Sequence, residues 1–265
     1  MFISFHTVKI NMKKLYLAVI ALTILCLFGC TTDVPDNDDN KNNDSSDIVV
    51  NNLDAKALII AYMKKLNNID FYESSTTGQT KAKKGFITYN QDIVSKTIKN
   101  NDQYYYESNS KSAFVNLTHK AYFSLDKVRY MHNSDEVKEI TMDEYRDNYG
   151  FTPCEESIGG YIVNEDTIIS CQSEKINGNV LIKFQLDSVK SAKNMQVQMK
   201  EFGSLSNLPT FNSISFELTL DSEEQPISLF NTAEYKISVA LLGEMNCVQN
   251  ITTIYNFDYK EMPII

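Results

Sequence analysis

The chain has 265 residues, of which 43% are hydrophobic and 22% charged, and its formal net charge is −9. This length suffices for one sizeable core or for two halves of one sheet. The acidic balance argues against nucleic acid as a partner, because phosphate binding needs a concentrated basic surface. The same acidity favours solubility and repels anionic lipid surfaces.

The N-terminal segment has the composition of a signal peptide. Lys13 and Lys14 precede an apolar run over residues 15–28. This run is shorter than the roughly 20 residues that a membrane-spanning helix needs. We therefore predict a signal peptide over residues 1–29, with translation starting at Met12. An ordinary secretory signal or a buried helix is the alternative.

The predicted signal ends in a motif that resembles the lipobox of bacterial lipoproteins. The motif is Leu27-Phe28-Gly29-Cys30, with Phe28 where a smaller residue is usual. The resemblance implies cleavage before Cys30, a diacylglyceryl group on its thiol and added acyl chains such as palmitate. It implies a lipid-anchored protein at the extracytoplasmic face of the cell membrane. Removal of Lys9 and the two signal lysines lowers the net charge from −9 to −12, so the acyl chains would have to hold the protein at the membrane.

Residues 30–50 are expected to form the lipidated cysteine and a flexible tether, because Asp, Asn and Ser dominate them. Asp36 and Asp38 match the opening of a calcium-binding loop. However, Lys41 stands where such a loop needs glycine, and no helical pattern flanks the segment. We expect no metal site and no cofactor. Residues 51–265 are expected to form a single β-rich domain.

The domain is predicted to open with a helix over residues 54–66. Asp54 can cap this helix, and Ile59, Tyr62 and Met63 recur at helical spacing. After this helix, apolar residues recur at every second position, which is the pattern of a strand. Long polar strands are predicted over residues 71–84, 85–99 and 103–108, followed by two strands within residues 113–130.

The second half of the domain repeats the strand pattern after a short helix, predicted over residues 142–149 and ended by Gly150. Strands are then predicted over residues 161–173, 179–187, 195–199, 214–220, 227–230, 235–241 and 251–259. Sustained alternation with short turns is typical of a large antiparallel sheet whose two faces differ. The predicted fold class is therefore α+β.

This order of elements, in an extracytoplasmic lipoprotein, is similar to the LolA/LprG-like group. The likeness covers about residues 48–265 and is carried by one N-terminal amphipathic helix, a mid-chain helix and the hairpins of residues 214–259. It implies a strongly curved antiparallel half-barrel whose helices plug the concave side. It also implies that the hollow holds acyl chains.

Three cysteines remain after the predicted processing: Cys154, Cys171 and Cys247. Cys154 and Cys171 lie seventeen positions apart across the Gly159-Gly160 turn, so a hairpin can bring them together. Such a disulfide would contribute roughly 3 kcal/mol by loop closure. Three free thiols are the alternative. The chain has no C-x-x-C pair, which excludes a zinc ribbon or a thioredoxin-type site.

The sequence offers little catalytic chemistry. His119 falls on the apolar face of its strand, which favours a hydrogen-bonded core histidine. His132 lies near Asp135 and Glu136, where a solvated loop is a simpler interpretation than a metal site. Neither a G-x-S-x-G elbow nor a glycine-rich phosphate loop occurs. We therefore predict a protein that is not an enzyme.

The apolar side of the predicted sheet is the candidate ligand-binding face, because one long helix leaves much of it uncovered. Its candidate residues are Val115, Leu117, Phe123, Phe216, Leu218, Val239 and Leu241. The predicted function is to bind or carry an amphiphilic or lipid ligand such as an acyl chain. The alternative is a non-catalytic surface module that meets a protein or glycan through exposed tyrosines such as Tyr104, Tyr105 and Tyr106. A hollow beneath the sheet would favour the first function, and a filled core the second.

Overall fold

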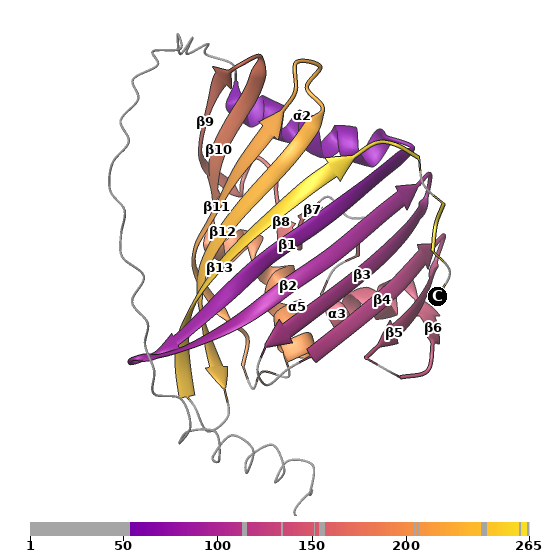
Figure 1. The fold of residues 1–265 in the computed structure, drawn as a ribbon, viewed down its shortest axis with the longest axis vertical. Helices are drawn as coiled ribbons and strands as arrows, with labels where there is room; N and C mark the ends of the chain where they lie inside the picture. Colours follow the sequence, from indigo (N-terminus) through magenta and orange to yellow (C-terminus); the bar gives the residue numbers. More distant parts are fainter. Residues whose placement is uncertain are drawn as a thin grey trace, which may run out of the picture. The chain divides into compact units, whose positions relative to one another are not determined.

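The structure is a computed structural model that describes residues 54–112, 116–133, 135–150, 152–153, 157–203, 205, 207–239, 243–259, 261–263 and 265. These residues belong to one compact unit, Asp47–Ile265, and their elements are labelled as in Figure 1. The expected signal peptide, lipobox and tether lie outside the described residues.

Eleven strands build one antiparallel sheet. Their bounds are β1 Phe71–Lys84, β2 Ile87–Asn100, β3 Gln103–Ser112, β4 Asn116–Ser124, β5 Lys127–His132, β6 Lys138–Thr141, β9 Ile168–Ile176, β10 Asn179–Leu186, β11 Thr210–Leu220, β12 Pro226–Val239 and β13 Gly243–Asn256. The spatial order is β6-β5-β4-β3-β2-β1-β13-β12-β11-β10-β9. The sheet is curved and open, with β6 and β9 at its edges (Figure 1). The predicted fold class is confirmed.

Alternating side chains produce the two faces of this sheet. Ile214, Phe216 and Leu218 of β11 are buried, whereas Glu217 between them is exposed. Side chains two positions apart share a face of a strand, so this pattern directs one apolar face to the interior. Tight hairpins join the strands. The β9–β10 turn has Asn177 and Gly178 at φ 51° and 85°, which suits a two-residue type I′ turn.

The pairing of β1 with β13 joins the two halves of the sheet. Along this pair Gly78 lies opposite Ile251. A Cβ atom added to Gly78 would lie 2.8 Å from the Cα atom of Ile251 and would also meet the carbonyl oxygen of Asn250. Real Cβ atoms do not approach so closely. Glycine at this position therefore permits a close backbone approach in the middle of the curved sheet.

In the described part of the chain, four helices accompany the sheet: α2 Ala55–Asn68, α3 Met142–Tyr149, α4 Ser188–Ser191 and α5 Lys193–Gly203. The carboxylate of Asp54 accepts a hydrogen bond from the Ala57 amide at 3.1 Å and caps α2. Thr141 and Glu144 form a capping box that starts α3. The two predicted helices are thus confirmed, with α2 starting one residue later and ending two residues later than expected.

The predicted strand over residues 195–199 is wrong, because this segment lies within α5. Met195, Val197 and Met199 alternate in the sequence, but Met195 and Met199 also have the i, i+4 spacing of one helical face. Both methionines pack against the hydrophobic core. The surrounding Lys, Gln and Glu favour helix, so the apolar pair is buried from a helix instead of a strand.

Several other strand boundaries differ from the prediction; β13, for example, spans Gly243–Asn256 instead of residues 251–259. The strand expected over residues 161–173 is divided into β8 (Tyr161–Ile162) and β9. Between them, the side chain of Asn164 accepts hydrogen bonds from the amides of Asp166 and Thr167, which stabilises a turn. β8 instead pairs with β7 (Ser157–Ile158) in a small separate sheet. Conversely, residues 227–230 and 235–239 of two expected strands are parts of the single strand β12 (Pro226–Val239), and residues 240–241 lie outside the described residues.

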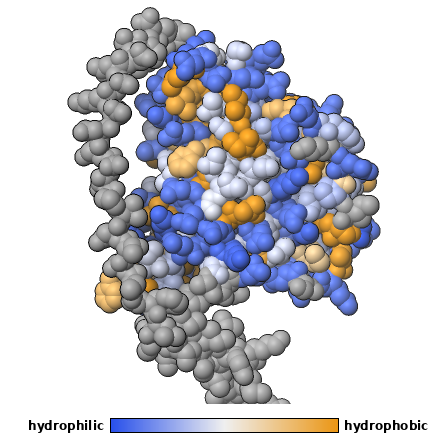
Figure 2. All heavy atoms as spheres, in the orientation of Figure 1, coloured by the Kyte–Doolittle hydropathy of each residue, from blue (hydrophilic) through white to orange (hydrophobic). Residues whose placement is uncertain are grey.

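The helices and the small β7–β8 sheet lie on the concave side of the large sheet. In Figure 1 the strands are in front, and α3 and α5 are behind them. The opposite, convex face is largely hydrophilic, with isolated hydrophobic patches (Figure 2). Val94, Phe230 and Ile254 are among its exposed apolar side chains. None of the helices in the described part of the chain has the length and apolar character needed to cross a bilayer.

Candidate functional site: a hollow under the concave face

A cavity of about 440 Å³ lies beneath the concave face of the sheet. Strands β1, β2, β3, β4, β12 and β13 contribute to its wall, and α5 and the segment around β7 and β8 cover it from the other side. The volume falls within the roughly 300–1,000 Å³ typical of small-molecule sites. The curved sheet is thus only partly filled by the protein's own side chains.

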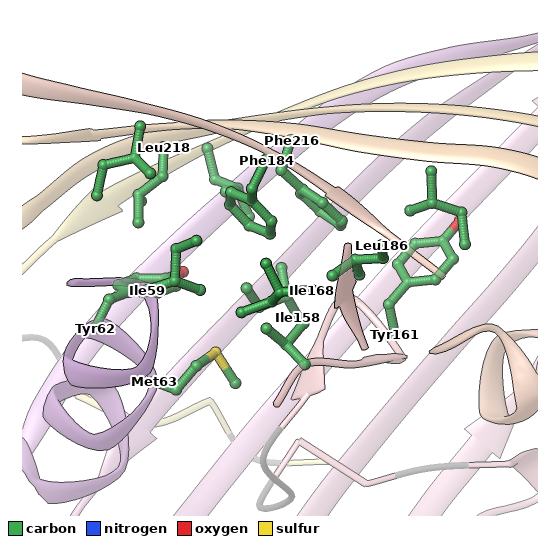
Figure 3. Packing of buried hydrophobic residues seen from close by; sticks show 14 of the residues in the cluster. Ile59, Tyr62, Met63, Ile158, Tyr161, Ile168, Phe184, Leu186, Phe216 and Leu218 are labelled. Carbon is green, nitrogen blue, oxygen red and sulfur yellow. The ribbon is translucent and has the colours of Figure 1, made fainter. Parts of the chain in front are cut away.

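An apolar core closes the hollow at the β9–β12 side. Ile59, Tyr62 and Met63 of α2 point toward Phe184 and Leu218 of the sheet (Figure 3). The rings of Phe184 and Phe216 stack with centroids 5.0 Å apart. Tyr62 and Phe216 also line the cavity. This end of the hollow therefore has a rigid, apolar wall.

A cluster of aromatic rings closes the other side, where α3 packs against β4, β5 and β6. His119 is 3% exposed, and its Nε2 atom lies 2.7 Å from the hydroxyl of Tyr145. The ring of Tyr149 lies 5.3 Å and that of Tyr106 6.2 Å from the imidazole, centroid to centroid. Burial, with a smaller contribution from nearby His132, lowers the pKa of His119 to about 3. The imidazole is therefore neutral at physiological pH and serves as a hydrogen-bonding core residue.

Between these two ends, the wall of the hollow is polar but uncharged. Hydroxyl and amide side chains alternate along the central strands: Ser74 and Thr76 of β1, Gln91, Ser95 and Thr97 of β2, Ser108, Ser110 and Ser112 of β3, and Gln249 and Thr253 of β13. Several of these groups bond to one another across strands. Thr76 and Thr253 share a hydrogen bond of 2.8 Å, and the Gln91 amide donates to Ser110 at 2.5 Å. The bonded pairs hold the wall in a defined arrangement.

Tyrosines frame this polar wall. The hydroxyls of Tyr62 and Tyr255 lie 2.6 Å apart, and Tyr72, Tyr89 and Tyr235 also line the cavity. Burial raises the pKa of Tyr255 to about 12, so its hydroxyl stays protonated. Among the described residues that line the hollow, none is an Asp, Glu, Lys or Arg, although charged residues make up 22% of the chain. Their exclusion is the main electrostatic property of the site.

The predicted ligand-face residues fall into three groups. Leu117, Phe123 and Phe216 line the cavity. Leu218 is fully buried in the core cluster, and Val239 is half-buried near the end of β12. Val115 and Leu241 lie outside the described residues. The hydroxyl-bearing positions were not predicted, although their alternation with charged and amide residues in residues 91–112 was visible in the sequence.

The tyrosines proposed for a surface interaction module do not form an exposed strip. Tyr104 is 6% and Tyr105 3% exposed, and Tyr106 lines the cavity. Tyr105 donates a hydrogen bond to Glu107 at 2.9 Å. The expectation that these three side chains are presented to a partner is wrong. Tyr104 and Tyr106 lie on the concave side of β3, and Tyr105, which shares the other face with Glu107, is itself buried.

The histidines and cysteines can be placed only in part. His132 lies in β5 opposite His119, not in a solvated loop, and it is half-buried beside the cavity. No cluster of three or more His, Cys, Asp or Glu suited to a metal ion occurs in the described part of the chain. Cys171 is exposed on β9 and Cys247 is buried. Cys154 lies outside the described residues, so its pairing with Cys171 stays a prediction.

Comparisons with known proteins find neither a matching family model nor a matching curated protein. Among solved structures, the chain is similar to LprF from Mycobacterium bovis, with 8% identity and a TM-score of 0.37. That match covers 80% of this chain and 96% of the other. It is also similar to a DUF1329 family protein from Desulfovibrio piger, with 8% identity and a TM-score of 0.31, covering 79% and 94% of the two chains. The function proposed below rests on the hollow itself.

Proposed function

We propose that this protein binds or carries an amphiphilic lipid, with acyl chains and their uncharged linking groups held in the hollow. The observation that carries the proposal is the cavity of about 440 Å³, whose described lining contains no charged side chain. Placing a carboxylate or phosphate there without a counter-charge would cost several kcal/mol. Ester, amide and hydroxyl groups, in contrast, can hydrogen-bond to the Ser, Thr and Tyr hydroxyls of the wall.

The core-side end of the hollow and its polar middle suit different parts of such a ligand. The core-side wall around Phe216 and Leu229 offers apolar surface, whereas Ser95, Ser108 and Ser110 offer hydroxyls. An amphiphile can contact the apolar wall with its acyl chain and hydrogen-bond to the hydroxyls with its linking group. An ionic headgroup would lie at the mouth of the hollow, in water.

We propose further that Cys30 carries the lipid anchor and that the domain works at the extracytoplasmic face of the cell membrane. The support is the Leu27-Phe28-Gly29-Cys30 motif after an apolar signal. An anchored carrier would exchange ligand with the bilayer to which it is attached. The burial of Tyr104 and Tyr105 removes the main support for the surface interaction module.

Native mass spectrometry after incubation with a bacterial lipid extract tests the proposal. The full chain should show discrete lipid adducts. Ser95→Phe, which fills the hollow from β2, should reduce the adducts, whereas Val94→Phe on the convex side of the same strand should not. Circular dichroism would verify that both variants fold. Absence of adducts on the folded wild type, or equal adducts on all three proteins, would contradict binding in this hollow.

A further inference from the structure

The tip of the β1–β2 hairpin presents an aromatic side chain fully to solvent. β1 ends at Lys84 and β2 begins at Ile87, so the turn consists of Gly85 and Phe86. Gly85 has φ +60°, as the first central residue of a type II′ turn requires. Phe86 is 99% exposed, and the tip extends beyond the neighbouring strands in Figure 1. One exposed apolar residue is ordinary on a protein surface. Whether Phe86 belongs to a contact surface therefore depends on the residues around it.

The surroundings of Phe86 are basic in an otherwise acidic chain. Lys81, Lys83 and Lys84 are exposed within four positions, whereas the chain has 34 acidic and 25 basic residues. In the described part of the chain these three lysines take no part in a salt bridge. The carboxylate of Glu244, at the start of β13, is bonded to Lys236 at 2.9 Å. The tip thus combines a cationic patch with a projecting aromatic ring.

The tip also lies at one end of the hollow. The strand pair Ala82 and Tyr89 is two steps from the last pair of the hairpin, Lys84 and Ile87. Ala82 and Tyr89 both line the cavity. A surface that contacts the tip would therefore lie beside this end of the cavity.

We propose that the β1–β2 tip docks the domain onto an anionic lipid bilayer, with Phe86 in the interface and the three lysines against the headgroups. Aromatic side chains partition to the bilayer interface, and each lysine near an anionic surface strengthens association about 5-fold. Docking in this orientation brings one end of the hollow to the bilayer. The contact is separate from the lipid anchor and offsets locally the repulsion caused by the net negative charge.

The chain contains no tryptophan, so Phe86→Trp in the full-length protein creates a single fluorescent reporter at the tip. Leu125→Trp is the matched control, because Leu125 is 84% exposed at the tip of the β4–β5 hairpin. Both proteins are added to phosphatidylcholine vesicles with and without phosphatidylglycerol, in which part of the phosphatidylcholine carries brominated acyl chains. On phosphatidylglycerol vesicles, the Phe86→Trp emission should shift to shorter wavelength and lose intensity by bromine quenching. The Leu125→Trp emission should remain that of tryptophan in water.

Replacing Lys81, Lys83 and Lys84 by Gln in the Phe86→Trp protein should weaken the quenching, by about 5-fold in vesicle affinity for each lysine. High salt should act in the same direction. Equal, water-like emission from both reporters would overturn the proposal and leave the tip to a protein partner. Quenching that is the same without phosphatidylglycerol and insensitive to the lysine changes would overturn the assignment to anionic lipid. None of these readouts requires a ligand in the hollow, so they are independent of lipid uptake.

Discussion

The Nε2 atom of His119 lies 2.7 Å from the hydroxyl oxygen of Tyr145, and this hydrogen bond links β4 of the sheet to α3 beneath it. Both side chains are nearly inaccessible to water, at 3% exposure each. Burial raises the pKa of Tyr145 and lowers that of His119 to about 3. The two groups therefore form a neutral pair that closes one side of the hollow.

This pair should make the stability of the domain fall in mild acid. The pKa of His119 is near 6.5 in the unfolded chain and about 3 in the fold. Between these values the unfolded chain binds a proton that the fold does not. The free energy of unfolding is therefore unaffected by the titration of His119 above pH 6.5. It should decrease by roughly 1.4 kcal/mol per pH unit as the pH falls from 6.5 toward 3. Urea unfolding between pH 7 and pH 5, above the range where most carboxylates titrate, measures the slope.

The matched variants are His119→Gln, which keeps a polar group but cannot titrate, and His132→Gln. The first should flatten the pH dependence. The second should have a smaller effect, because His132 is only half-buried. An unchanged slope in His119→Gln would show that another group is responsible.

Gly78→Ala should destabilise the domain by about 1–3 kcal/mol, as overpacking in a dense interior does. The added methyl would collide with the backbone of Asn250 and Ile251, which cannot move without disturbing the β1–β13 pairing. Thr77→Ala, at the exposed neighbouring position, should change stability by less than about 0.5 kcal/mol. Thermal unfolding compares the two, and equal losses would contradict the close approach.

The remaining cysteines should differ in reactivity. Burial raises the pKa of Cys247 to about 12, and thiolates are the reactive form, so Cys247 should resist alkylation until the protein unfolds. Cys154 and Cys171 should be joined by a disulfide, which non-reducing peptide mapping detects as one cross-linked peptide. Alkylation of both Cys154 and Cys171 in the native protein would refute the disulfide.

Cys30→Ala should release the protein from the membrane fraction or mislocalise it, because the acyl chains are its proposed anchor. Fractionation of cells that express the variant and the wild type measures this. The net negative charge of the chain would not retain the released domain on an anionic bilayer by itself. A wild-type protein found wholly in the cytosol would contradict the anchor.

Much of the fold was predictable because the alternation of side chains is so regular. Ile214, Phe216 and Leu218 alternate with polar residues, and both the strand and its buried face follow from that period. The segment from Met195 to Met199 was misassigned because its apolar spacing fits a strand and a helix equally well. The surrounding Lys, Gln and Glu favour helix, and the packing of both methionines against the core from one helical face, which the sequence does not reveal, distinguishes the two.

The site was less predictable than the fold. Apolar residues such as Phe216 and Leu218 share one face, but only tertiary packing decides that Phe216 borders the cavity while Leu218 fills the core. The serines of β3 look like a solvent-exposed edge when they are read alone. They become a cavity wall because the sheet curves around them and α5 covers the opening.

The pairing of β1 with β13 also has a consequence for how the chain folds. Residues that meet along this pair, such as Thr76 and Thr253, are 177 positions apart. Contacts between such distant positions slow folding, because the chain must lose the entropy of closing a long loop before these contacts can stabilise it. Until β13 arrives, both β1 and β12 present an unpaired edge, which is a site of aggregation. These edges stay exposed from the synthesis of the first strand to that of the last, so the aggregation hazard spans nearly the whole domain.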